Sequence, residues 1–137
     1  MRIEVSTSLP NDARDIRTKV FVDEQGFTEE FDNQDATAIH LVGYINDIAA
    51  ATCRILNQQN DDYFIGRIAV QKDYRKNGFG SLIVAEAEKI IRTRGGKRIY
   101  IHSQEQAKNF YLKIGYSDTG ERDFEEGCPH CMLIKNL

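Results

Sequence analysis

The stretch from Arg67 to Leu82 constrains the fold of this chain more than any other. Apolar and other side chains alternate around Ile68 and Val70, which is typical of a β-strand. Turn-forming residues follow as far as Gly80, and beyond it the apolar residues recur at the spacing of one helix face. Because the period of the apolar pattern changes at the turn, the stretch predicts a strand, a tight glycine turn and an amphipathic helix.

This glycine turn has a chemical use. The first N–H groups of a helix lack intrahelical partners, and the helix dipole places partial positive charge beside them. Gly78 and Gly80 carry no side chain that would keep an anion away from these groups. Arg75 and Lys76 add positive charge next to the turn. The unit is therefore predicted to bind a phosphate group.

Two common nucleotide motifs do not fit the turn. A Walker A loop ends in Gly-Lys followed by Ser or Thr, and no part of the chain has that ending. The dinucleotide fingerprint G-x-G-x-x-G finds its first two glycines in Gly78 and Gly80, but Ile83 stands in place of the third.

The pattern Arg75-x-x-Gly78-x-Gly80 resembles the R/Q-x-x-G-x-G/A loop of the GNAT superfamily of N-acetyltransferases, which binds the pyrophosphate of acetyl-CoA. The strand before the loop fits the same family, and residues 109–116 resemble its F-Y-x-x-x-G-[FY] segment. These three features follow one another in the family's order, and the order of predicted elements is similar to the family's over essentially the full chain. The resemblance implies an enzyme, an acyltransferase with acetyl-CoA as its co-substrate.

The resemblance also implies which residues bind acetyl-CoA. The pyrophosphate would lie on the loop, mainly on backbone N–H groups, and the pantetheine would lie along the preceding strand, where a bulge frees backbone groups. The Val70 N–H is the implied donor to the thioester oxygen, and the Ser81 hydroxyl could instead cap the helix. The implied binding residues are Ile68, Ala69, Val70, Arg75, Lys76, Asn77, Gly78, Phe79, Gly80, Ser81, Asn109 and Tyr111.

Tyr111 matches the family's tyrosine that protonates the departing thiolate. A phenol has a pKa near 10 and is therefore protonated at neutral pH. Its position on the apolar face of a predicted helix would otherwise indicate a core aromatic. The resemblance to the family favours the catalytic role.

The general base is less well defined, and the candidates are Glu24, His40, His102 and His130. His102 follows a strand where the sheet is expected to open. The segments 20–25 and 127–130 resemble the ElaA/YjcF-like bacterial branch of the GNAT proteins, which singles out Glu24 and His130 as catalytic residues to test. A chain of water molecules is the alternative.

The length and the pattern of the whole chain predict a single domain over residues 1–137, of the α+β class, with a mixed central sheet of about seven strands flanked by helices. The resemblance implies that this is an N-acetyltransferase (GNAT) domain. We expect strands at 1–7, 38–45, 48–56, 63–70, 99–101, from 115, and at 131–134. Helices are expected up to about 22, from 80 to about 94, and at 104–114. The strands at 63–70 and 99–101 are expected to be parallel because a helix connects them.

Three connections complete this prediction. Asn46-Asp47 is a two-residue hairpin turn. Asp23–Ala36, the acidic loop, is polar and aperiodic, which is typical of a solvated loop, but its two phenylalanines need burial, so a lid or wall of a binding cleft is the alternative. Residues 121–127 are expected to form an acidic hairpin connection.

Composition and the length of apolar runs argue against several classes of protein. The net charge of −3 gives no support for nucleic-acid binding or for binding to an anionic membrane. No apolar run has the length of a membrane span or of a signal-peptide core, so a cytoplasmic location is expected. The three cysteines argue against a disulfide framework. The segment 128–131 offers three potential zinc ligands and has no second cluster, so no metal is predicted.

The resemblance thus implies direct transfer of acetyl from acetyl-CoA to the primary amine of a small molecule. The acidic loop would suit a cationic acceptor such as a polyamine, an aminoglycoside or a basic amino acid. The alternatives are an amine of a peptide or protein, and a CoA-binding sensor of the same fold without turnover. An acyl-accepting Cys128 or Cys131 beside His130 is a further option, and a homodimer is one option for the assembly.

Overall fold

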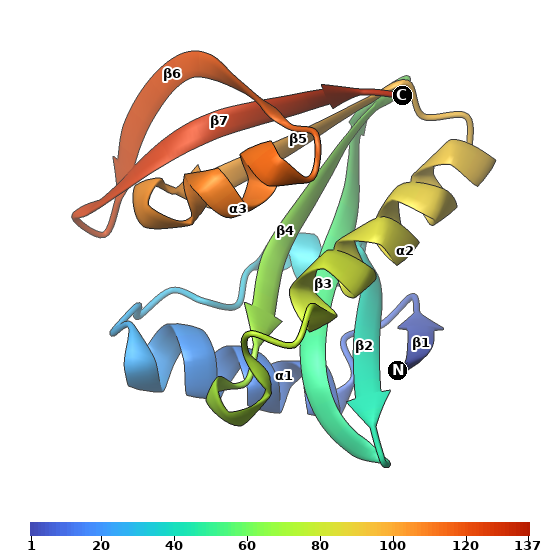
Figure 1. The fold of residues 1–137 in the computed structure, drawn as a ribbon, viewed down its shortest axis with the longest axis vertical. Coiled ribbons are helices and arrows are strands. Elements are labelled where there is room, and N and C mark those ends of the chain that lie inside the picture. The colour runs from blue at the N-terminus through green and yellow to red at the C-terminus, as the bar shows by residue number, and fades with distance from the viewer.

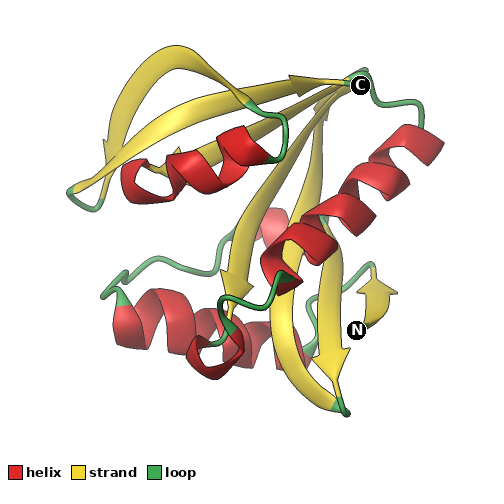
Figure 2. Ribbon diagram, in the orientation of Figure 1, coloured by secondary structure: helices red, strands yellow, loops and turns green.

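The computed structural model describes all 137 residues, and its seven strands form one sheet in the order β1-β2-β3-β4-β5-β7-β6 (Figures 1 and 2). The strands are β1 (Arg2–Ser6), β2 (Ile39–Ile45), β3 (Ile48–Gln59), β4 (Asp62–Val70), β5 (Arg98–Gln104), β6 (Ser117–Glu125) and β7 (Cys128–Asn136). The α-helices are α1 (Asn11–Arg17), α2 (Phe79–Thr93) and α3 (Lys108–Lys113), and α1 continues as a π-helix, η1 (Thr18–Glu24). Short 3₁₀ turns are η2 (Asn33–Ala36), η3 (Lys72–Tyr74) and η4 (Glu105–Ala107).

The prediction of a mixed α+β sheet of seven strands is confirmed, and so is the parallel pairing of β4 with β5. That pairing is short, from Asp62 opposite Arg98 to Phe64 opposite Tyr100. Beyond this point the two strands diverge, as Figure 1 shows. The rest of β4 remains paired with β3 alone, so its other edge carries backbone groups without a strand partner.

A bulge in β4 accompanies this divergence. The register between β3 and β4 shifts between Thr52 and Arg54, and Arg67 adopts a positive φ of 50° opposite the shift. A bulge of this kind bends and twists its strand, and bulges are common beside active sites.

Helices cover both faces of the sheet. Leu41 and Val42 are adjacent on β2 and point to opposite faces, because successive side chains of a strand alternate. Leu41 packs in the larger core, together with Ile83 and Ile91 of α2. Val42 packs in a smaller core, together with Ile16 of α1. The sheet is thus buried on both faces at β2.

Several boundaries differ from the predicted ones. The predicted first helix is α-helical only to Arg17 and widens into the π-helix η1. β3 extends to Gln59, past the predicted end at 56, because it pairs with β4 as far as Asp62. The expected connection at 121–127 is wrong: most of it is strand β6, which pairs with β7, and the turn is only Glu126-Gly127. Likewise β7 is longer than predicted, and the helix expected at 104–114 is split into η4 and α3.

The predicted hairpin turn between β2 and β3 is confirmed. Asn46 and Asp47 both have positive φ, at 49° and 65°. Positive φ at both central residues is the signature of the I′ turn that favours right-handed twist in hairpins. None of the helices has both the length and the apolar character needed to cross a membrane.

Candidate active site

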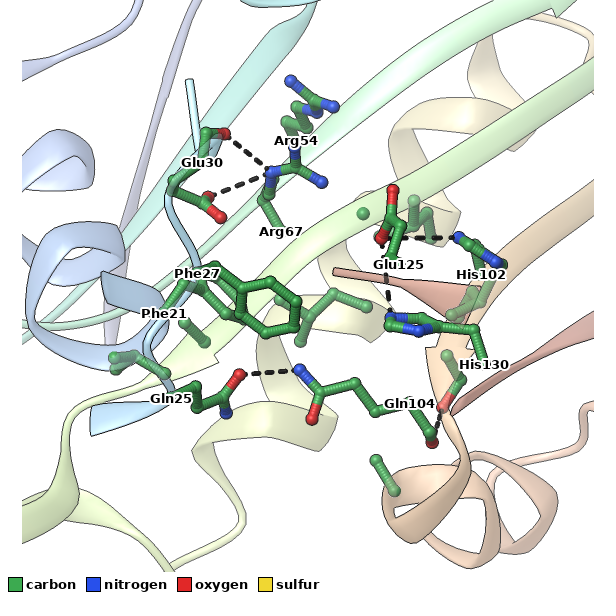
Figure 3. A pocket seen from close by; sticks show the side chains of 18 of the residues that line it. Phe21, Gln25, Phe27, Glu30, Arg54, Arg67, His102, Gln104, Glu125 and His130 are labelled. Atoms are coloured by element: carbon green, nitrogen blue, oxygen red, sulfur yellow. Dashed lines mark hydrogen bonds and ion pairs between the residues drawn. The ribbon is translucent and has the colours of Figure 1, made fainter. Parts of the chain in front are cut away.

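A cavity of about 1400 Å³ opens where β4 and β5 diverge. Its lining comes from both halves of the sheet, from the turn before α2, and from the acidic loop, which forms a wall, as the alternative interpretation expected. Two contacts join the acidic loop to the other side: Gln104 donates to Gln25 Oε1 at 2.6 Å, and the Thr28 N–H donates to Glu126 Oε1 at 2.9 Å. Figure 3 shows the first of these contacts beside Phe27 of the acidic loop and Phe21 of η1.

The N-terminus of α2 meets this cavity with unpaired backbone donors. Gly78 is the N-cap residue, with φ of 80° and no capping side chain. The first N–H that donates within the helix is that of Leu82, to the Gly78 carbonyl at 3.1 Å. The N–H groups of Phe79, Gly80 and Ser81 therefore have no intrahelical acceptor. The alternative role of Ser81, as the helix cap, is not seen, because no side chain caps α2.

Gly80 also answers a packing requirement. A Cβ at this position would lie 3.3 Å from the Phe110 ring and 3.7 Å from a Val70 methyl group. The helix therefore approaches Phe110 of α3 more closely than most side chains would allow, whereas the distance to Val70 is an ordinary contact. At Gly78, by contrast, a Cβ would meet nothing within 4 Å, so this position is open toward the cavity that it lines.

The amide of Val70 faces the opening between β4 and β5. Its carbonyl accepts from Arg75 Nε at 2.9 Å, whereas the next N–H, of Gln71, donates to the Ala50 carbonyl on β3 at 2.8 Å. The N–H and C=O of one strand residue point to the same edge. The Val70 N–H consequently lies on the edge away from β3. We call this N–H, with those of Phe79, Gly80 and Ser81, the amide end of the site.

Arg75 holds the turn rather than offering a free charge. Its two terminal nitrogens bind both oxygens of Glu24, at 2.8 and 3.0 Å, in the fork geometry typical of arginine and carboxylate. Its Nε binds the end of β4. Glu24, one of the two predicted bases, is therefore committed to Arg75 and does not line the cavity.

Tyr111 lies in the floor of the cavity, 7% exposed. Its ring packs edge-on against Phe110, with 5.0 Å between the centroids. Burial raises the pKa of Tyr111, which keeps the phenol protonated over the whole neutral range. The position therefore combines core packing with access to the cavity, and the two interpretations of this residue are compatible.

Ion pairs fix the acidic loop to the sheet. Arg17 is almost fully buried and donates to Asp35 Oδ1 at 2.8 Å and to Glu30 Oε2 at 2.9 Å. Arg54 donates to the same Asp35 oxygen at 2.9 Å, and Arg67, at the bulge, pairs with Glu30 at 2.9 Å. Figure 3 shows how Glu30 reaches Arg67. Paired charges inside a protein require good geometry to offset desolvation, and here each carboxylate has at least two partners.

Opposite the amide end, three side chains from three neighbouring strands converge. They are His102 on β5, Glu125 on β6 and His130 on β7, and we call them the histidine end. The two imidazole rings stack with 4.6 Å between centroids. Glu125 Oε2 lies 3.9 Å from His102 Nδ1 and 3.6 Å from His130 Nε2. Figure 3 shows the carboxylate pointing toward both rings.

The structure brings most of the predicted residues to this cavity. The predicted residues that line it are Ile68, Ala69, Val70, Arg75, Lys76, Gly78, Phe79, Gly80, Tyr111 and His130. Asn77 and Ser81 line a smaller hollow of about 590 Å³ beside α2, and Asn109 is exposed and lines neither. Of the other histidines considered, His102 lines the cavity, whereas His40 is buried and bonded to the Asp35 carbonyl at 2.9 Å.

Glu125 is the residue that sequence reasoning missed. It lay in a stretch interpreted as a connection, and only the pairing of β6 with β7 brings it beside His130. A signal existed, since alternation of Asp123 and Glu125 with Phe124 is a strand pattern with two acids on one side. For Cys131 the cysteine alternative is disfavoured, because this residue is fully buried and burial raises the pKa of its thiol.

Comparisons of the sequence and of the structure with known proteins both find acetyltransferases. The family model described as "Acetyltransferase (GNAT) domain" matches residues 9–137. An uncharacterized N-acetyltransferase of Bacillus subtilis, YjcF, is 33% identical over 129 residues, which cover 91% of this chain and 91% of that protein.

Solved structures agree. Escherichia coli ElaA superimposes with a TM-score of 0.85 and 26% identity over 98% of this chain and 99% of that one. A Bacillus subtilis acetyltransferase in complex with CoA has a TM-score of 0.76 over 99% of this chain and 98% of that one. Its identity of 22% makes this a similarity of fold.

Proposed function

This chain belongs to the GNAT family of acetyltransferases, and from that premise we propose that it transfers the acetyl group of acetyl-CoA to the primary amine of a small cationic molecule. One observation carries the proposal: the cavity has unpaired N–H donors at its amide end and unpaired acceptors at its histidine end. An anion can bind at the amide end. The acceptor amine, which is an ammonium ion until it is deprotonated for the reaction, can bind at the histidine end. A single cleft of about 1400 Å³ has room for both substrates.

At the amide end the pyrophosphate binds to the first N–H groups of α2, where the helix dipole adds to their effect. The pantetheine lies along the open edge of β4 at Ile68, Ala69 and Val70. The Val70 N–H then donates to the thioester oxygen, where negative charge grows in the transition state. Lys76 and Asn77 flank the phosphates.

The chemical step needs a neutral amine and a protonated leaving group. The amine nitrogen forms a bond to the carbonyl carbon, and the carbon–sulfur bond then breaks. Tyr111 gives its proton to the departing sulfur, and His130 Nε2 takes a proton from the amine. The products are the amide and the free thiol of CoA. Solvent afterwards restores the proton of the phenol and removes that of the imidazole.

His130 suits the role of base better than Glu24. Its Nδ1 lies 2.9 Å from the Cys128 carbonyl oxygen, which can only accept, so Nδ1 carries the proton and Nε2 keeps its lone pair toward the cavity. Glu24, in contrast, has both oxygens bound to Arg75. We assign Glu24 to holding the turn, although it was an equal candidate on sequence.

The charge of the cavity supports a cationic acceptor. Acidic residues of the rim gather at the histidine end and on the adjoining wall, namely Glu29, Asp123, Glu125 and Glu126. Arg54 and Arg67, also in the lining, have their charge balanced by Asp32, Asp35 and Glu30. A polyamine, an aminoglycoside or a basic amino acid offers the second positive charge that such a rim selects.

The test is a calorimetric titration with acetyl-CoA, run beside a free-thiol release assay on a panel of amines. The panel pairs diamines and aminoglycosides with neutral monoamines of similar length, and includes peptides with a free N-terminus or lysine. We expect binding and faster thiol release with the dications. Release only with peptides would support the protein-acceptor alternative, and binding without release on any amine would support a sensor. Absence of binding would show that the amide end does not bind CoA.

A further inference from the structure

The histidine end contains three hydrogen-bond acceptors without a donor between them. His102 Nδ1, Glu125 Oε2 and His130 Nε2 all lie within 4.8 Å of one another. Both distances from the carboxylate oxygen, 3.6 and 3.9 Å, exceed the length of a hydrogen bond. Among ion pairs, Glu125 has only these two histidines as partners, and no lysine or arginine approaches it. Three such atoms repel one another unless a positive centre lies between them.

The outer nitrogen of each imidazole is held by an oxygen. His102 Nε2 lies 2.7 Å from Asp123 Oδ1, and His130 Nδ1 lies 2.9 Å from the Cys128 carbonyl. Both oxygens accept, so these nitrogens carry the protons and the inner nitrogens keep their lone pairs. This is the arrangement around histidine ligands in metal sites, where a carboxylate or a backbone carbonyl orients each ring.

We propose that His102 Nδ1, Glu125 Oε2 and His130 Nε2 form a binding site for a divalent transition-metal ion, zinc foremost. Two imidazoles and one carboxylate are a ligand set of zinc sites that keep an open fourth position. That fourth position faces the cavity, which all three residues line. Each ligand stands on a strand, β5, β6 or β7, and paired strands hold side chains more firmly than loops do.

This set differs from the cluster that the sequence displays at 128–131. Cys131 is buried in the core between sheet and helices, and Cys128 contacts the outer nitrogen of His130 through its carbonyl while its thiol lies 3.9 Å from the Pro129 carbonyl oxygen. Only His130 belongs to both sets.

The site has a consequence that rests on the proposed function. A zinc ion on His130 Nε2 occupies the lone pair that takes the proton of the amine. Zinc and the acceptor amine therefore exclude one another, and the ion inhibits transfer.

The experiment is titration of the EDTA-treated full-length protein with Zn²⁺ against a chromophoric chelator, and with Co²⁺ while recording its visible absorption. We expect one ion per chain and, for Co²⁺, the intense bands of a four-coordinate site. His102→Phe, which keeps a ring on His130, and Glu125→Gln should each weaken binding at least about 100-fold. Asp123→Asn, which loosens the orientation of His102, should weaken it about 10- to 100-fold.

Cys128→Ser is the matched control and should leave the affinity unchanged. Loss of zinc in this variant, or unchanged affinity in Glu125→Gln, would overturn the site. Because Glu125 is half exposed, that variant tests the ligand without endangering the fold. These readouts need no turnover, so they stand apart from the proposed function. Thiol release by the wild-type protein should fall along the same zinc titration and return with EDTA. Full activity at saturating zinc would reject the inhibition.

Discussion

The two ends of the cavity are built in different ways. The amide end presents backbone N–H groups of one short stretch, from Val70 to Ser81, and only Val70 comes from outside the turn and helix. The histidine end presents side chains from three strands that are distant along the chain but adjacent in the sheet. Backbone donors offer the same chemistry for any anion, whereas the side chains of the histidine end can change one by one. Under the proposed function, local geometry selects the donor substrate and tertiary arrangement selects the acceptor.

The largest effect should come from the residue between the two ends. Tyr111→Phe removes the proposed proton donor to the thiolate and should lower turnover by roughly 10² to 10⁴-fold with little change in CoA affinity. Steady-state kinetics and calorimetry measure the two quantities separately. Tyr116→Phe is the control, because Tyr116 is buried nearby and donates to Glu88 at 2.8 Å outside the cavity. If Tyr111→Phe turned over at the wild-type rate, Tyr111 would not be the acid.

Breaking the amide end should abolish binding of the donor. Gly78→Asp places a carboxylate against the pyrophosphate, and like charges in contact cost several kcal/mol, so CoA affinity should fall by at least about 100-fold. Gly95→Asp is a matched control at the other end of α2, with φ of 85° and no atom within 4 Å of its Cβ position. It should share the backbone strain and keep the affinity. Equal CoA affinities in the two variants would contradict the placement of the pyrophosphate on this turn.

The ion pairs in the wall of the cavity should make the stability of the fold depend on pH. Burial opposes the charge on Asp35, but Arg17 and Arg54 more than offset this and lower its pKa from 3.8 to about 2. The ion pairs therefore stabilise the fold above pH 3.8, and this contribution, about 2 kcal/mol, is lost as the pH falls toward 2. Urea unfolding at several pH values measures it.

Asp35→Asn should lose at least that amount of stability at pH 7, because it leaves two buried guanidinium groups without full compensation. The difference in unfolding free energy between Asp35→Asn and the wild type should narrow as the pH falls from 4 to 2. Asp32→Asn is the control, since Asp32 is partly exposed and this substitution should cost less stability than Asp35→Asn. A gap that does not depend on pH would contradict the assignment.

The smallest expected effect tests whether the histidine end selects a charged acceptor. In the presence of EDTA, Glu125→Gln should raise the KM for a diamine only about two- to fivefold, because the carboxylate is half exposed and exposed ion pairs are weak. A neutral monoamine should show no change in KM. Equal changes for both acceptors would mean that Glu125 does not select for charge.

Most of the fold follows from local patterns. Alternation, helical spacing and the glycine turn predicted the order of strands and helices, because each element leaves its own period in the sequence. The errors lie where tertiary contacts decide: β6 is exposed throughout and has no apolar pattern of its own, and it is a strand because β7 pairs with it. The widening of α1 into η1 likewise left no sign in the spacing of its apolar residues.

By itself the sequence determined the amide end, because Gly78, Gly80 and the start of α2 are neighbours in the chain and their backbone supplies the chemistry. It also determined the match to the GNAT family. The tertiary structure alone decided that Arg75 binds Glu24, that Asp35 joins two arginines, and that Glu125 stands between two histidines. These are side-chain contacts between segments that are distant along the chain, and for Glu125 and the two histidines the register of the paired strands sets them.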